Sequence, residues 1–212
     1  MPSWNIHLEA GNRLADKLNF SPKERKEFLL GCILPDVNNG HLYNKAVFKD
    51  HDYTHYISDV KNPLDFYTKN QDKIDQRVPI HLGYLLHLFL DNYFNQDFYQ
   101  HTVQDSQYSH LPRPKQRDLK HRDFWLYDAK FHHSIGLDQS EANQLASLAN
   151  SIPPIDITAE NLVEIEKLLT NNELGHSRKG ENYLIYTEAK LDHLLESAIE
   201  DFEKQYLGES YA

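Results

Sequence analysis

Cysteine and basic residues are scarce in this chain of 212 residues. The single cysteine, Cys32, excludes an intrachain disulfide and a zinc site built from several cysteines. Lysine and arginine together number 22 against 32 aspartates and glutamates, which gives a formal net charge of −10. Because nucleic acids and anionic lipids attract basic surfaces, this balance argues against a nucleic-acid-binding surface and against electrostatic docking on membranes.

Long apolar segments are also missing. Residues 82–90 form the longest strongly apolar stretch, but His87 interrupts it and it is too short to span a bilayer. The first residues, Met1 to Trp4, lack the basic and apolar regions of a secretory signal. We therefore expect a soluble, cytoplasmic protein without a transmembrane segment, and the sequence gives no indication of its oligomeric state.

Glycine is scarce as well, with 8 residues, and no alternating β-branched runs recur, so the sequence does not predict a β-sheet. Helix signals are frequent, and Ser21, Pro22 and Glu24 together form one helix start. We predict a single all-α domain over residues 1–212, with about seven or eight helices around a central buried helix. The predicted helices span about 5–19, 22–34, 79–99, 117–135, 139–150, 158–172 and 182–207, another begins near Asn62, and loops span 38–54 and 101–116.

Histidine, by contrast, is abundant. The chain has 13 histidines, and 11 of them precede residue 134. Histidine is the commonest metal ligand in proteins and the usual acid–base group near neutral pH. The first 133 residues are therefore where a site is to be sought.

The strongest local pattern is His87 followed four residues later by Asp91 in the predicted central helix. This spacing places both side chains on one helix face, and Tyr84 and Asn95 extend the same polar stripe. A buried aspartate is costly unless it is paired or bound to a metal. Because imidazole nitrogen and carboxylate oxygen are zinc ligands, the pair indicates a metal site, with a hydrogen-bonded His–Asp pair inside the core as the structural alternative.

Three further segments carry side chains of the same kinds. His7 lies on the buried stripe of the first predicted helix, and Asp36 follows Pro35 directly after an apolar helix. His51 and His55 lie four residues apart in the predicted loop. Each of these residues has an ordinary structural interpretation by itself, but together they favour a metal site.

Four segments of the N-terminal half carry a resemblance to a known family. They are Met1-Pro2 through His7, Phe28-Leu29-Leu30-Gly31 through Pro35-Asp36, Thr54-His55-Tyr56, and Gly83-Tyr84-Leu85-Leu86-His87 through Asp91. In these segments the chain resembles the zinc-dependent phospholipase C family, which is all-helical and related to the S1/P1 nucleases. The resemblance implies that metal ions are held by His7, Asp36, His55, His87 and Asp91.

The resemblance also implies an activity. Members of the family hydrolyse phosphate esters with a cluster of zinc ions, so we expect a metal-dependent phosphoric ester hydrolase. A metal-activated water would attack phosphorus, and Asp36 would orient that water or accept its proton. His51 and Tyr84 are expected to contact the ligands or the substrate. The substrate would be a phospholipid or a small phosphoester.

The chain departs from the family in two places. The secreted phospholipases bind zinc through the amine of a mature N-terminal tryptophan, whereas Trp4 is internal here. They also carry a second His-xxx-acidic pair in a later helix, for which His121, Asp128 and His132 are the nearest substitutes and the candidate additional ligands. We therefore expect one or two divalent ions, zinc first, although iron, manganese or nickel would suit such ligands.

Two alternatives stay open. HD-type metal phosphohydrolases are also helical and use a His, an adjacent His-Asp pair and a later Asp. Here His51-Asp52 supplies the pair, and His7 or His41 together with Asp91 could complete the set. The other alternative is a non-catalytic helical protein that binds a metal or a partner. An open metal position facing solvent would indicate catalysis, whereas a closed four-ligand site would indicate a structural role.

Overall fold

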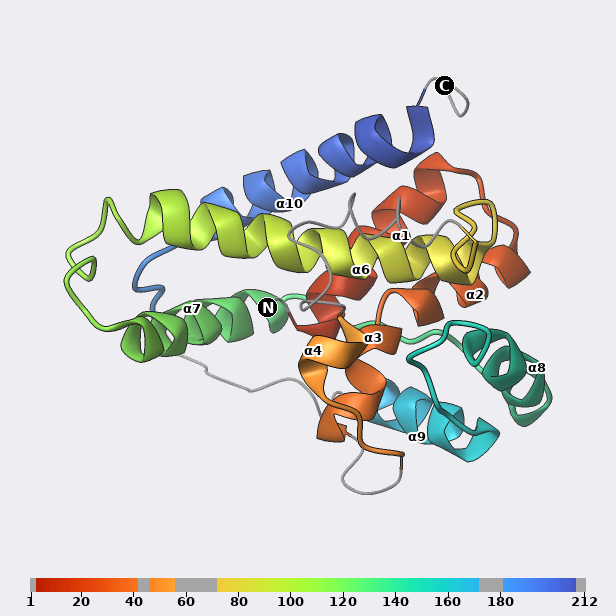
Figure 1. The fold of residues 1–212 in the computed structure, drawn as a ribbon. Helices are drawn as coiled ribbons and strands as arrows, with labels where there is room; N and C mark the ends of the chain where they lie inside the picture. Colours follow the sequence, from red (N-terminus) through yellow and green to blue (C-terminus); the bar gives the residue numbers. More distant parts are fainter. Residues whose placement is uncertain (1–2, 42–45, 56–71, 172–180, 209–212) are drawn as a thin grey trace.

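Every element of secondary structure in the described residues is helical, which confirms the predicted all-α class (Figure 1). The computed structural model describes residues 3–41, 46–55, 72–171 and 181–208. The α-helices are α1 (Trp4–Lys17), α2 (Pro22–Gly31), α3 (Leu34–Asp36), α4 (His51–Thr54), α6 (Pro79–Gln96), α7 (Arg113–Asp128), α8 (Gln139–Ala149), α9 (Ala159–Thr170) and α10 (Glu188–Phe202). The π-helical segments are η1 (Val37–His41), η2 (Asp97–Thr102) and η3 (Glu203–Leu207).

Helix α6 runs through the middle of the molecule, with α10 along one side and α3 and α4 on the other (Figure 1). Of its 18 residues, 13 are buried, as expected for the predicted central helix. Phe89 of α6 packs edge-on against Phe202 of α10, with ring centroids 5.5 Å apart. Buried apolar side chains of α1 and α2 complete the core around this helix.

Two glycines let α2 and α6 approach closely. A methyl group added to Gly31 would overlap the carbonyl oxygen of Ile80, and one added to Gly83 would overlap that of Phe28. A methyl group on Gly83 would also lie 3.0 Å from the Cα atom of Gly31. Glycine is therefore required on both sides of this crossing, because the two backbones leave no room for a side chain.

The prediction of a loop over 38–54 is wrong at both ends. Helix α2 ends at Gly31, and α3 follows with Pro35 in its first turn, where the missing amide hydrogen is not needed. The π-helical segment η1 continues directly from α3. At the other end, Asp50 caps the short helix α4 by accepting a hydrogen bond from the amide of Asp52 (2.9 Å).

Two later helices differ from the predicted bounds. Helix α7 covers Arg113–Asp128 instead of 117–135, since Pro114 lies in its first turn, where proline is tolerated. Helix α10 begins at Glu188, because the amides of residues 184–186 donate to the buried carboxylate of Asp123 at 2.8–2.9 Å. The helix predicted to begin near Asn62 lies outside the described residues.

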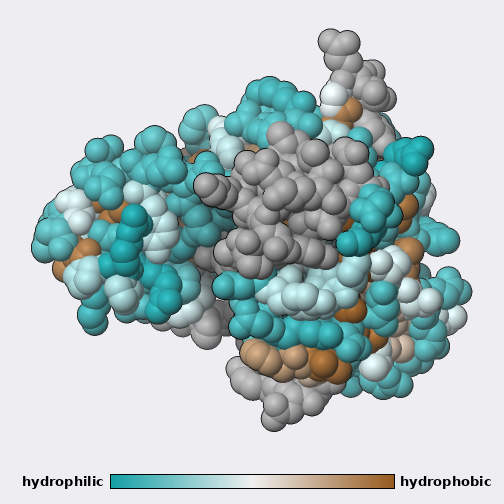
Figure 2. Space-filling model, in the orientation of Figure 1, coloured by the Kyte–Doolittle hydropathy of each residue, from teal (hydrophilic) through white to brown (hydrophobic). Residues whose placement is uncertain are grey.

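The surface in Figure 2 is mostly hydrophilic. Within the described ranges, no helix is long and apolar enough to cross a membrane. The exposed large hydrophobic side chains of the described residues are Val47, Phe48 and Tyr53. All three lie in or just before α4, which is one of the elements that build the site described next.

Candidate metal centre

The five side chains predicted as metal ligands converge at one place. His7 comes from α1, Asp36 from α3, His55 from the residue after α4, and His87 and Asp91 from adjacent turns of α6. All five residues are buried, and Asp91 is the most exposed of them at 7%. Elements far apart in the sequence are therefore needed to assemble the group.

The potential ligand atoms form three overlapping triads, and in each triad they lie within 4.8 Å of one another. The first triad is His7, His87 and Asp91, and the second is Asp36, His55 and His87. A third adds the partly exposed His51 to His55 and Asp91. We refer to these six residues as the His/Asp cluster: His7, Asp36, His51, His55, His87 and Asp91.

Nitrogen and oxygen atoms in the cluster face one another at distances longer than those of good hydrogen bonds. His7 Nε2 lies 3.4 Å from Asp91 Oδ1, and His55 Nε2 lies 3.5 Å from both Asp36 Oδ1 and Asp91 Oδ2. His87 Nε2 lies 3.7 Å from Asp91 Oδ2. A tetrahedral ion with ligand distances of about 2.1 Å separates its ligand atoms by about 3.4 Å, whereas N–H···O bonds measure about 2.9 Å. The spacing therefore fits a bound cation.

The hydrogen bonds of the other ring nitrogens fix the tautomers of three imidazoles. Each Nδ1 atom lies close to a backbone carbonyl oxygen: His7 to that of Ser3 (2.9 Å), His87 to that of Cys32 (2.8 Å) and His55 to that of His51 (3.0 Å). A carbonyl oxygen can only accept, so each Nδ1 carries a proton, and in a neutral ring the Nε2 lone pair then faces the cluster. Metal-bound histidines show the same arrangement.

Several polar atoms of the cluster lack partners among the described residues. Both carboxylate oxygens of Asp91 and the Nε2 atom of His7 are buried and make no hydrogen bond there. The Nε2 atoms of His55 and His87 are 3.2 Å apart, and two lone pairs at that distance repel each other. Buried charges and unpaired polar groups are costly, and a cation coordinated by these atoms would remove both problems.

The pKa values of the cluster favour its metal-binding protonation states. Burial lowers the pKa of His87 to about 3, with His7 adding to the effect and Asp91 opposing it. Burial also lowers the pKa of His55. Burial alone would raise the pKa of Asp91, but the facing imidazoles outweigh it and lower that pKa. Neutral imidazole and ionised carboxylate are the forms that coordinate metals.

We expect the metal-free protein to lose stability as the pH falls below about 6.5, the ordinary pKa of histidine. In the folded chain His87 stays neutral down to about pH 3. In the unfolded chain the same side chain is protonated below about pH 6.5. For this one group the free energy of unfolding would fall by up to about 1.4 kcal/mol per pH unit. Urea unfolding in the presence of a chelator at pH 7, 6 and 5 measures the slope.

The control variant for this prediction is His87→Asn. Its amide can still donate to the Cys32 carbonyl oxygen but takes up no proton between pH 7 and 5. The unfolding of this variant should therefore take up about one proton fewer than that of the wild type, so its free energy of unfolding should fall less steeply with falling pH. Equal slopes for the two proteins would contradict the buried, neutral state of His87.

Tyr84 and His51 occupy different positions around the cluster. Tyr84 is fully buried, and its hydroxyl donates to the carbonyl oxygen of Thr54, so it supports the residue that precedes His55. The ring of His51 stacks on that of His55, with centroids 3.8 Å apart, and its side chain is 36% exposed. His51 is therefore the member of the cluster that is most accessible to solvent.

The structure does not bring His121, Asp128 and His132 together as a further set of ligands. Helix α7 ends at Asp128, so His132 lies beyond the helix and the predicted stripe is interrupted. Asp128 accepts hydrogen bonds from the side chains of Ser3 and Asn5, and His132 Nε2 lies 3.1 Å from a backbone carbonyl oxygen. Asp128 therefore anchors the start of α1 to the end of α7.

Only one residue of the adjacent pair proposed for an HD-type site belongs to the cluster. His51 belongs to the cluster, but the side chain of Asp52 is 65% exposed and is in none of the triads. The side chain of His41 lies outside the described part of the structure. The arrangement of described residues therefore gives the HD-type alternative no support.

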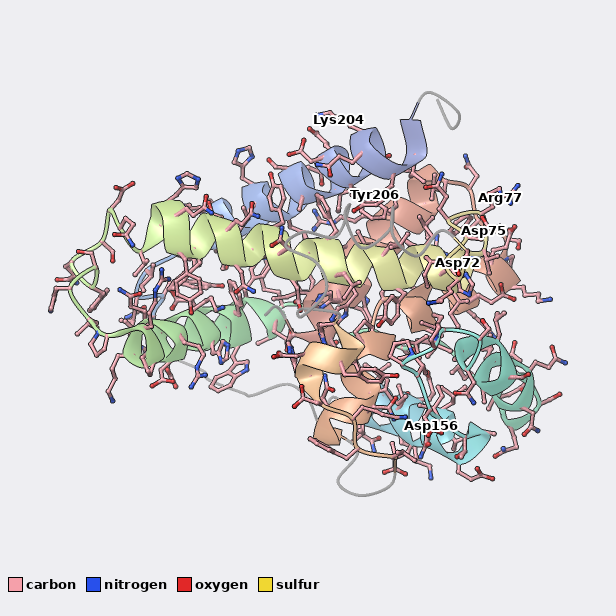
Figure 3. All side chains as sticks on the ribbon, in the orientation of Figure 1. Asp72, Asp75, Arg77, Asp156, Lys204 and Tyr206 are labelled. Carbon is pink, nitrogen blue, oxygen red and sulfur yellow. The ribbon has the colours of Figure 1, made fainter. Side chains whose placement is uncertain are left out.

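His81, another buried histidine of α6, has the hydrogen bonds of a structural residue. His81 Nδ1 accepts a hydrogen bond from the amide of Asp75 (3.1 Å), so its Nε2 carries the proton and donates to Ser151 Oγ (3.1 Å). Asp75, labelled in Figure 3, forms an ion pair with Arg77 (2.8 Å) at the start of α6. Both ring nitrogens of His81 make hydrogen bonds, whereas the Nε2 atom of His7 makes none among the described residues.

Sequence reasoning missed a buried lysine on α7. Lys120 is 3% exposed, and its ammonium group donates to Asn95 Oδ1 (2.5 Å) and lies 5.0 Å from the centroid of the Tyr99 ring. Burial lowers the pKa of Lys120, while the negative charge of Asp91 acts in the opposite direction. No spacing pattern distinguishes this lysine from the exposed basic residues around it.

Comparison with models of known protein families, with curated proteins and with solved structures gives no match for this chain. The geometry is therefore the basis for what can be said about function. It shows buried clusters of histidine and aspartate that could bind a metal ion.

Proposed function

We propose that the His/Asp cluster binds one or two divalent metal ions and that the chain hydrolyses phosphate esters in the manner of the zinc-dependent phospholipase C family. The observation that carries the proposal is the convergence of three Nε2 lone pairs on two buried carboxylates. A hydrogen-bonded core would require a second proton on these imidazoles, and burial disfavours that proton on His55 and His87, whose pKa values it lowers.

The donor set favours zinc. Three imidazole nitrogens with two carboxylate groups suit zinc, and iron, manganese and nickel accept similar ligands. The ligand residues would be His7, Asp36, His55, His87 and Asp91, with His51 at the exposed side. Because Asp91 directs its two oxygens toward different histidines, it is the residue suited to link two metal positions.

A bound divalent ion would supply a polarised phosphoryl oxygen and a water with a pKa lowered toward 7. The chain itself supplies the groups around that chemistry. Asp36 directs Oδ1 toward His55 and Oδ2 toward His87, so its carboxylate is held inside the cluster, where it can orient a water or accept a proton. His51, whose side chain is 36% exposed, would contact a substrate phosphate from the solvent side.

Two kinds of substrate contain the phosphoester that this site would hydrolyse: a phospholipid and a small phosphoester. Experiment can distinguish them. Val47, Phe48 and Tyr53 are exposed beside His51, which would suit the apolar part of a phospholipid. The chain as a whole is acidic and this exposed apolar area has only three residues, which suits a small phosphoester equally well.

The test begins with metal content. Protein purified without a histidine tag should carry about one or two equivalents of zinc or a related metal by mass spectrometry. Hydrolysis of bis(p-nitrophenyl) phosphate, p-nitrophenyl phosphate and phosphatidylcholine vesicles is then followed before chelation, after chelation and after zinc is restored. Activity on at least one substrate that follows the metal supports the proposal. A folded, metal-supplemented protein without bound metal would exclude it.

The second candidate is a non-catalytic metal-binding protein. The observation in its favour is the burial of the cluster, in which five of six residues are 7% exposed or less. A closed site of this kind would hold its metal without admitting a substrate. Stoichiometric metal without hydrolysis of any of the three substrates would establish this alternative.

A further inference from the structure

A second connection joins Asp36 and His55 outside the cluster. It runs through Asn39, a half-buried residue of η1 that the ligand pattern does not include. Asn39 Nδ2 lies 3.4 Å from Asp36 Oδ1, the same oxygen that faces His55 Nε2 at 3.5 Å. On its other side, Asn39 Oδ1 lies 3.1 Å from the hydroxyl of Thr54, whose single proton it shares with the carbonyl oxygen of His51 at 3.2 Å.

The orientation of the Asn39 amide follows from its third contact. Nδ2 lies 3.1 Å from the carbonyl oxygen of Pro35, which can only accept, so this end of the amide is the donor. The opposite end must then be the carbonyl that accepts from Thr54. One planar amide thus donates toward Asp36 and accepts from the residue that precedes His55.

The far end of this connection is itself fixed. Thr54 is fully buried, and its carbonyl oxygen accepts the hydrogen bond from the Tyr84 hydroxyl of α6. Its hydroxyl oxygen also lies 3.0 Å from His55 Nδ1. Asn39 therefore ties the element that carries Asp36 to a point that is already held against α6.

We propose that Asn39 is a positioning residue that sets the separation of the two ligands Asp36 and His55. This inference rests on the metal binding proposed above but not on the proposed reaction. Asparagine suits the position because it combines a donor and an acceptor in one short, planar group. Aspartate has the same shape, but it cannot donate and would bring a negative charge beside Asp36.

The first experiment measures metal binding by Asn39→Asp. We expect the zinc affinity, measured by competition with a chelator, to fall about 10–100-fold, the usual cost of losing a residue that orients a ligand. The visible spectrum of the cobalt-substituted protein should also change, because it reports the arrangement of ligands around the ion. A variant that is merely less stable would keep the wild-type spectrum in its folded fraction.

The matched control is Asn150→Asp. Asn150 also donates and accepts with its amide, bonding to the carbonyl oxygen (2.8 Å) and amide (3.0 Å) of Ile157 between α8 and α9. This control should leave the zinc affinity and the cobalt spectrum unchanged. An equal loss of affinity in the control would show a general loosening of the fold and would overturn the role of Asn39.

Thr54→Val tests the same connection from its other end, because it keeps the shape of the side chain and removes the hydroxyl. We expect a smaller loss of zinc affinity in the same direction. The double variant with Asn39→Asp should lose less than the product of the two single losses, because both changes break one connection. Multiplicative losses would show that the two residues act separately.

The outcomes for the two proposals are distinguishable. Wild-type protein that binds zinc tightly but hydrolyses none of the substrates contradicts the proposed reaction and leaves the role of Asn39 intact. Wild-type affinity and spectrum in Asn39→Asp overturn that role and leave the proposed reaction intact. Folded wild-type protein that binds no zinc overturns both.

Discussion

Replacing Asp91 by asparagine is expected to abolish tight metal binding. Asp91 faces His7 and His55 at 3.4 and 3.5 Å, and both of its oxygens lack hydrogen bonds among the described residues. Asparagine removes the negative charge that would hold the metal, so the metal affinity should fall by roughly 100-fold or more.

Two unfolding curves per protein test this expectation. At a metal concentration 100 times the dissociation constant, the wild type should gain about 2.7 kcal/mol over its chelated form, and Asp91→Asn should gain almost nothing. The control Asp128→Asn changes a buried carboxylate that is bonded to Ser3 and Asn5, so it should keep the metal and lose stability in both conditions. If Asp91→Asn gains as much stability from the metal as the wild type does, Asp91 is not a ligand.

Gly83→Ala is expected to be the most destabilising small substitution in the central helix. Its methyl group would overlap the carbonyl oxygen of Phe28 and lie 2.9 Å from the backbone nitrogen of Cys32, and backbone atoms cannot move aside singly. Helix α2 would have to shift, at a cost of about 3 kcal/mol or more in the free energy of unfolding. The shift would also lengthen the bond from His87 to the Cys32 carbonyl oxygen, so metal affinity should fall as well.

Chemical unfolding and chelator competition measure the two effects. Gly136→Ala is the matched control, since a methyl group there meets only the end of the Lys26 side chain, at 3.9 Å. Gly136 has a φ of +75°, so this control should cost about 1–2 kcal/mol through backbone strain alone and leave metal affinity unchanged. Similar losses for both variants would show that the close helix crossing is not what positions His87.

The long elements could be predicted from the sequence because apolar periodicity and caps mark them. Helix α6 follows from its continuous apolar residues, and His87 and Asp91 follow from their spacing on it. Short elements gave no such signal. Helix α4 has four residues, fewer than a periodic pattern requires, so His51 and His55 were expected in a loop. Their stacking and convergence depend on contacts between elements, which spacing does not encode.

Residues that act through hydrogen bonds were harder to find than ligands. Asn39 and Thr54 belong to residue types that are common in turns and caps, and their partners are single atoms on other elements. The predicted stripe of His121, Asp128 and His132 failed for a related reason, because a helix end cannot be placed within a few residues from sequence. The role of a residue is therefore hardest to predict where it depends on whether the helix continues for one more turn.

The three acceptors that orient the imidazoles are main-chain carbonyl oxygens, those of Ser3, Cys32 and His51. Every residue type provides a carbonyl oxygen, so these bonds place no demand on which side chain stands at the three positions. Mutations there would be limited by local packing and by other bonds, not by the support of the ligands. Such a centre tolerates sequence change around its ligands far better than one oriented by carboxylate side chains, in which each supporting residue would be a separate target for inactivating mutations.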